Sequence, residues 1–308
     1  MSTGHVGKRD ELPGWLLAFG PFLVIAGLIA LGLLAYATFD FSWLAVEGTA
    51  NILLVMTGIG FIAGILPVMV GMLWFPYFRR LEPHWIHAVL AFSAGILAFI
   101  AVEMAVGAIG YASETSVPAI GGGVALVGAV ATIAAMELLS RWRKRKVESV
   151  QGEGLTVAYL VAIGLGLHSI GEGLAIGTAF VGGEMALVIL FTVGFIIHNV
   201  TEGPAVIAAV AREQVAPPLR HFAALGILAG GGVIVGGWLG TFAYTPMLGT
   251  IFFAVAAGAI IQVTWEMFDL VRTDAETVVD RRIVAAFVVG VVVLFVLEEI
   301  IVEGYMGL

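Results

Sequence analysis

The segment that decides the fold is TVAYLVAIGLGLHSIGEGLAIGTAFVGG, residues 156–183, in which the polar stretch HSIGEG (168–173) interrupts a run of apolar residues. Further along the chain, ALVILFTVGFIIHNVTEGPAVIAAVA (186–211) repeats this arrangement, with HNVTEG at 198–203. Each segment is long and apolar enough for a helix to span a bilayer, which takes about 20 residues. The two segments therefore predict membrane helices that carry the same His and Glu pair at membrane depth.

The composition of the whole chain agrees with a membrane protein. Of its 308 residues, 60% are hydrophobic and 12% are charged, and the mean hydropathy is +1.07. Soluble domains are close to half apolar and a quarter charged, so we expect the lipid bilayer to surround this chain. Cysteine is absent, which excludes disulfides and thiolate metal sites. No basic face with interleaved aromatic residues occurs, so we expect no nucleic-acid partner.

Nine segments are long and apolar enough to cross a membrane. They lie at roughly 14–38, 51–75, 83–111, 118–140, 157–181, 185–211, 220–243, 247–271 and 283–306. The first is longer than the apolar core of a signal peptide and no clear cleavage pattern follows it, so we expect it to remain as a helix. The sequence therefore predicts an all-α fold, a polytopic bundle of about nine transmembrane helices.

The positions of the basic residues predict the orientation of these spans. With nine spans, all 14 Lys and Arg residues fall in segments on the same side of the membrane, and the opposite connections contain none. Because cytoplasmic segments are enriched in Lys and Arg, we expect a multi-pass protein of the cell membrane with a cytoplasmic N-terminus and an external C-terminus. The densest group, RWRKRK (141–146), begins a cytoplasmic loop at 141–156.

The repeated motif has the composition of a metal site. On a helix, His at i and Glu at i+4 lie on one face, and two consecutive spans are antiparallel neighbours. Two neutral imidazoles and two carboxylates suit a divalent ion such as zinc, with iron, manganese, cobalt and cadmium as alternatives. The two carboxylates also neutralise the charge of one such ion. We therefore expect His168, Glu172, His198 and Glu202 to bind one metal ion.

A structural role is the alternative interpretation of the motif, with each His and Glu forming a hydrogen-bonded pair that holds helices together. Ionisable groups at membrane depth cost several kcal/mol unless they are paired or face an aqueous path. Two copies in neighbouring helices favour the metal site, because shorter polar residues would join helices at a lower cost.

At these motifs the chain resembles the ZIP (Zrt/Irt-like) family of divalent metal transporters, which carry HNxPEG on one core helix and HExPHE or HExPEG on the next. The resemblance implies an eight-helix core at 46–308, an additional N-terminal helix within 1–45, and the long cytoplasmic loop at 141–156. It implies that the His and Glu residues form the transport site, with zinc, Fe²⁺, Mn²⁺ or Cd²⁺ moving into the cytoplasm as substrate. We also expect a homodimer.

Some residues depart from the family pattern. Ser169 and Asn199 stand where the family often has Asn and an acidic residue that help to hold a second metal, and Gly171 and Thr201 replace the usual prolines. Ser169 and Asn199 are neutral, so a second ion that shared Glu172 and Glu202 would leave a costly excess of positive charge. We therefore expect one tightly bound metal, with Ser169 and Asn199 as weaker candidate ligands.

A further acidic residue, Glu266, lies at membrane depth four residues after Gln262, so these two form a second polar helix face. We assign Glu266 to the metal path or to a proton relay. A membrane-embedded zinc metallohydrolase is the alternative function, because the same ligands could hold a catalytic zinc. Such an enzyme usually needs a general base beyond its ligands, and Ser169, Asn199 and Thr201 are poor bases. We therefore expect a protein that is not an enzyme.

Overall fold

The computed structural model describes residues 48–78, 82–150, 154–208, 218–243, 245–274 and 281–306, together with the single positions 20, 23, 27 and 210. Eight helical segments in this part of the chain are long and apolar enough to cross a membrane. They match the last eight predicted spans, and the all-α polytopic bundle is confirmed. The first predicted span, 14–38, and the N-terminal unit 1–45 lie outside the described residues apart from three isolated positions.

Six of the spans are single helices: α4 (Pro83–Ser113), α5 (Pro118–Ser149), α6 (Gly154–Val181), α7 (Met185–Ile207), α10 (Pro246–Asp274) and α11 (Arg281–Met306). The other two are interrupted. One runs through α2 (Thr49–Gly60), the π-helical turn η2 (Phe61–Ile65) and α3 (Leu66–Phe78). The segment predicted at 220–243 divides into α8 (Leu219–Gly230) and α9 (Gly232–Gly240), because three consecutive glycines weaken the helix where the two halves meet.

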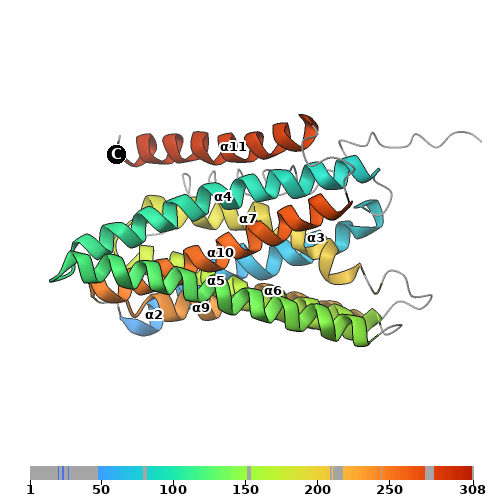
Figure 1. Ribbon diagram of the computed structural model, residues 1–308, viewed down its shortest axis with the longest axis horizontal. Coiled ribbons are helices and arrows are strands. Elements are labelled where there is room, and N and C mark those ends of the chain that lie inside the picture. The colour runs from blue at the N-terminus through green and yellow to red at the C-terminus, as the bar shows by residue number, and fades with distance from the viewer. Residues whose placement is uncertain are drawn as a thin grey trace, which may run out of the picture.

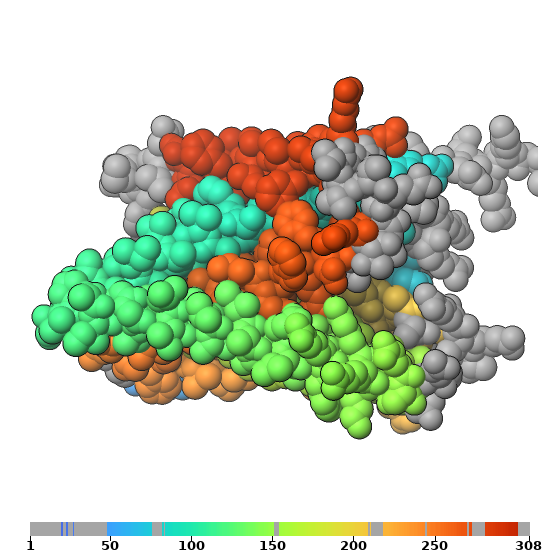
Figure 2. All heavy atoms as spheres, in the orientation of Figure 1, coloured from blue at the N-terminus to red at the C-terminus, as the bar shows by residue number. Residues whose placement is uncertain are grey.

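The helices run beside one another along the long axis of the molecule (Figure 1). α4 packs against α10 and α11, α6 packs against α9, and α3 packs against α7. α11 lies at one edge of the bundle, and α5 lies across the face that Figure 2 presents. α5 and α11 are the least buried spans, whereas α10, α7 and α4 are the most buried. The helix with the second motif, α7, therefore belongs to the interior of the bundle.

Glycines let the two motif helices approach their neighbours closely. A Cβ atom on Gly173 of α6 would overlap the backbone of α9 at the Val233 carbonyl, and one on Gly203 of α7 would overlap the backbone of α3 at the Val68 carbonyl. Small residues at helix interfaces are typical of membrane bundles, because van der Waals packing drives helix association there. Each motif is thus held against a different neighbour by a glycine next to its glutamate.

The described Lys and Arg residues gather at one end of the bundle, at the right in Figure 1, where α5 and α10 end and α8 and α11 begin. We call this the basic end. Its residues are Arg141, Arg143, Lys144, Arg145, Lys146, Arg220, Arg272, Arg281 and Arg282. The grouping agrees with the positions expected from the sequence.

Candidate metal site

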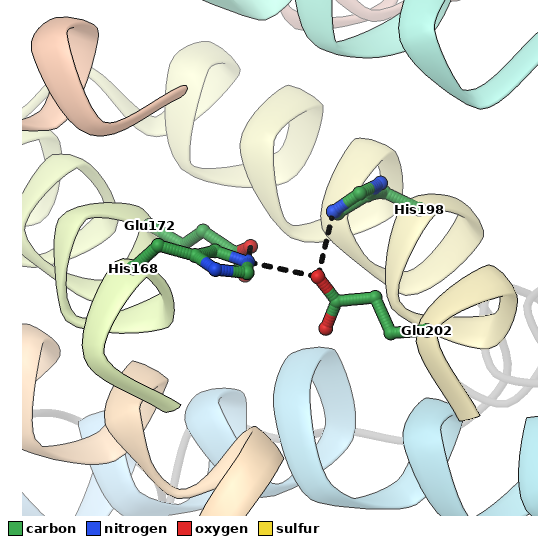
Figure 3. A group of neighbouring side chains, drawn as sticks. All are labelled: His168, Glu172, His198 and Glu202. Atoms are coloured by element: carbon green, nitrogen blue, oxygen red, sulfur yellow. Dashed lines mark hydrogen bonds and ion pairs between the residues drawn. The ribbon is translucent and has the colours of Figure 1, made fainter. Parts of the chain in front are cut away.

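The four motif residues meet in the interior of the bundle. His168 and Glu172 extend from α6, and His198 and Glu202 extend from α7 toward them (Figure 3). All four are buried, with exposed fractions between 0% and 6%. One ligand atom from each lies within 4.8 Å of the others. The side chains that the sequence predicted as a set therefore form a single cluster, which we call the His/Glu cluster.

One carboxylate oxygen lies at the centre of this cluster. The Oε1 atom of Glu202 is 2.8 Å from Nε2 of His168 and 3.1 Å from Nε2 of His198. Glu172 is less closely engaged, because its Oε1 atom lies 3.9 Å from Nε2 of His168. Ligands of one tetrahedral zinc ion are roughly 3.4 Å apart, given bonds of about 2.1 Å. The cluster therefore fits a zinc-sized ion after small side-chain movements.

The buried oxygen atoms of the cluster also point to a cation. Among the described residues, Oε1 of Glu172, Oε2 of Glu202 and Oδ1 of Asn199 have no hydrogen-bond partner. A buried acceptor without a donor is costly, and a divalent ion satisfies several acceptors at once. The chemistry of the donor set, two imidazoles and two carboxylates without sulfur, suits zinc, iron, manganese or cadmium.

The orientation of His198 is fixed by a residue from a distant part of the sequence. Its Nδ1 atom lies 2.8 Å from the hydroxyl of Ser93 in α4, which lies 3.2 Å from the hydroxyl of Thr201. Thr201 in turn donates to the His198 carbonyl at 2.7 Å. When Nδ1 of His198 donates to Ser93, the Ser93 hydroxyl can donate to Thr201, and Thr201 donates to the His198 carbonyl. In this tautomer Nε2 of His198 has no proton and keeps its lone pair. In this arrangement Nε2 would be available to bind a metal ion.

Asn199 holds the other carboxylate. Its amide nitrogen donates to Oε2 of Glu172 and to the carbonyl of Ala63, both at 2.9 Å. Ala63 lies in η2, where the wider helical turn alters the regular backbone hydrogen bonding. The sequence predicted Asn199 as a weaker candidate ligand, and in the structure its amide nitrogen connects Glu172 of α6 to η2, which lies between α2 and α3. Sequence reasoning missed both Ser93 and this backbone carbonyl, because polar contacts between distant segments have no spacing signature.

Ser169 and Glu266, two other residues of the predicted site, have hydrogen-bond partners outside the His/Glu cluster. Ser169 donates its hydroxyl to the Leu165 carbonyl in its own helix at 3.0 Å. Glu266 lies outside the His/Glu cluster and forms an ion pair with Arg143 of α5, while Ser140 donates to the same carboxylate oxygen at 2.9 Å. The four-residue cluster is therefore assembled without them.

A cavity of about 450 Å³ joins the His/Glu cluster to the basic end. His168, His198 and Glu202 line its inner part, and Lys144 and Glu148 line it near the end of α5. Apolar side chains form most of the remaining wall, including Leu90, Leu139, Val161 and Met267. An ion in the cluster therefore has a route toward one end of the bundle.

A second cavity, of about 520 Å³, lies at the opposite end. Three carboxylates line it, those of Glu103, Glu114 and Glu184, together with the phenol of Tyr111. Glu184 lies in the loop between α6 and α7, and burial, together with the negative charge of Glu114, raises its pKa. The bundle thus has an acidic cavity at one end and, at the other, a mostly apolar cavity whose lining includes both cations and carboxylates.

No protein-family model matches this chain, and no curated protein matches it as a relative. The functional assignment therefore depends on the chemistry and the location of the His/Glu cluster.

Proposed function

We propose that this chain is a membrane transporter that carries a divalent metal ion into the cytoplasm through the His/Glu cluster, and that it belongs to the ZIP family. The observation that carries the proposal is the convergence of four buried ligand atoms within 4.8 Å inside a bundle of membrane-spanning helices. Zinc is the substrate expected first, with Fe²⁺, Mn²⁺ and Cd²⁺ as alternatives, because the imidazole and carboxylate ligands suit these ions.

Charge balance supports one ion in each transport event. Glu172 and Glu202 carry two negative charges when ionised, and these offset the charge of one divalent ion in a medium where unbalanced charge is costly. Metal ligands must be deprotonated, so loading releases any protons that the empty site holds. Metal movement is therefore linked to proton release, and acidic conditions oppose binding.

The two cavities support a direction of movement. The acidic cavity beside Glu103 and Glu184 would attract cations from outside, and the cavity beside Lys144 would deliver them to the cytoplasm. This direction assumes that the basic end is cytoplasmic, as the distribution of Lys and Arg indicates. The cell membrane is the proposed location, and a homodimer is the proposed assembly.

Transport explains the site better than zinc-dependent hydrolysis does. A hydrolase needs a carboxylate or another base close to the metal in addition to the ligands. Glu266 lines the same cavity, but it is paired with Arg143 and also lies 3.9 Å from the amine of Lys144. Both cations contact the same carboxylate oxygen, so Glu266 is engaged by side chains of α5 and not by the His/Glu cluster.

Uptake by the purified protein in liposomes that contain a metal-responsive dye tests the proposal. We expect the wild-type protein to admit Zn²⁺, and His168→Ala to lower the rate at least about 100-fold, because it removes a ligand whose loss the remaining three do not replace. Phe242→Ala serves as a control, since this residue is 44% exposed on the bundle surface away from the cluster. Hydrolysis of a substrate without influx, or influx at the wild-type rate in His168→Ala, would contradict the proposal.

A further inference from the structure

Arg143 occupies an unusual place, because it brings a positive charge into the cavity through which the proposed cation would leave. Its side chain is 17% exposed and forms an ion pair with Glu266, which is 18% exposed. Both residues line the cavity that contains His168 and Glu202. An arginine in the path of a divalent cation requires an explanation, since it repels the ion unless a carboxylate neutralises it.

The packing of α6 makes room for this guanidinium. A Cβ atom on Gly164 would lie 2.5 Å from Nη1 of Arg143 and 2.8 Å from its Cδ. Gly164 precedes His168 by four residues, which is about one helical turn, or roughly 6 Å along the axis. The charged end of Arg143 therefore lies about one turn from the first histidine of the cluster.

A buried amide, that of Gln262, lies near Glu266, the ion-pair partner of Arg143. Gln262 lies one turn before Glu266 on α10 and lines the same cavity, and it is 3% exposed. Its amide nitrogen makes no hydrogen bond of standard geometry among the described residues, although the Glu137 carboxylate of α5 lies within its electrostatic reach. Rotating the amide group of Gln262 by about 180° places its oxygen where its nitrogen now lies. Gln262 and Glu266 can then offer one oxygen ligand each.

We propose that Arg143 acts as a tethered cation that occupies Glu266, so that the cavity holds one divalent ion in the His/Glu cluster and does not hold a second at Glu266 and Gln262. The inference rests on the proposed function. Without Arg143, a partly buried carboxylate would lose its main partner, and a free cation would be the group that best replaces it. The arginine therefore sets the number of ions that the chain binds.

Lys144 is the second cation near Glu266, at 3.9 Å, and it also lies 3.9 Å from Asp269. Its side chain is 53% exposed, so it could move toward Glu266 when Arg143 is removed. A variant that carries both Arg143→Gln and Lys144→Gln therefore tests the inference more strictly than the single change. The matched control is Arg145→Gln, because Arg145 is exposed on the same helix and does not line the cavity.

Isothermal titration of the purified full-length protein with Zn²⁺ alone measures the number of bound ions. We expect about one ion per chain for the wild type and for Arg145→Gln, and about two for the Arg143→Gln, Lys144→Gln variant. Adding Glu266→Gln should return the number to about one. These results would support the tethered cation.

If the wild type binds Zn²⁺, two results would overturn the tethered cation: a stoichiometry that stays at one in the double variant, or a wild-type protein that already binds a second ion lost in Glu266→Gln. Failure of the proposed function has a different signature. If the wild-type protein binds one Zn²⁺ ion but admits none into liposomes, the proposed transport function is wrong. The number of ions bound by the double variant would still test the role of Arg143. A wild-type protein that binds no Zn²⁺ would overturn both.

Discussion

The two motifs, HSIGEG on α6 and HNVTEG on α7, are close to identical in spacing, yet the structure gives their residues different surroundings. Glu202 of α7 has one oxygen beside both histidines, whereas Glu172 of α6 is held by the amide of Asn199 and remains 3.9 Å from His168. His198 is oriented by Ser93 through its second ring nitrogen. The difference teaches that a repeated motif need not supply equivalent ligands, because the neighbours of each helix decide how each ligand is held.

The largest expected effect separates the two glutamates. Glu202→Gln should weaken Zn²⁺ binding on the order of 1,000-fold, and Glu172→Gln roughly 10- to 100-fold, as measured by competition with a zinc chelator. Both changes remove the same charge, but Glu202 already lies at ligand spacing from both imidazoles, and Glu172 must move and give up its contact with Asn199. Contributions that require rearrangement are smaller.

An equal loss in the two glutamine variants, or a larger loss in Glu172→Gln, would show that the motifs are equivalent. The exposed pair offers a control: Glu137→Gln removes a carboxylate whose partner is Arg141 on the bundle surface, and it should leave zinc affinity unchanged.

Alanine substitutions of the motif glycines should reduce stability by similar amounts in α6 and α7. This result would mean that the two motifs differ in their polar contacts and not in their packing. Gly173→Ala and Gly203→Ala each place a methyl group against the backbone of a neighbouring helix, and we expect each to reduce the free energy of unfolding by about 1–3 kcal/mol. Thermal unfolding in detergent measures this loss. Gly122→Ala in α5 is the matched control, because a Cβ atom there meets nothing within 4 Å and alanine favours the helix by up to about 1 kcal/mol.

Stabilities of Gly173→Ala and Gly203→Ala that match the control would mean that the close helix contacts are not needed. A loss confined to one of the two would extend the asymmetry of the motifs from their polar groups to their packing.

The smallest expected effect concerns the support of His198. Ser93→Ala should weaken Zn²⁺ binding roughly 10-fold, because the imidazole loses the group that fixes its orientation, while the ligand itself is kept. Ser113→Ala removes a hydroxyl that bonds only the Gly110 carbonyl at an exposed position in the same helix, so it should have no effect on binding. Unchanged affinity in Ser93→Ala would mean that α7 orients its histidine without help from α4.

The sequence predicted the bundle well because one strong signal, the length of the apolar segments, carries the information. Runs of about 20 apolar residues locate spans without any knowledge of packing, and all eight spans in the described residues were found in this way. The break between α8 and α9 and the π-helical turn at η2 escaped notice, because local helix geometry depends on packing partners and on glycines that serve several purposes.

The sequence by itself determined the candidate ligands and their depth, since an i, i+4 spacing puts His and Glu on one helix face and consecutive antiparallel spans bring the two faces near each other. Only the tertiary structure decided which glutamate bridges the histidines, that Ser93 and the Ala63 carbonyl support them, and that Glu266 pairs with Arg143. The reason is physical: spacing within a helix is fixed by 3.6 residues per turn. Contacts between α4, α5, α7 and α10 depend on helix rotation and approach, which arise from the packing of all the spans together.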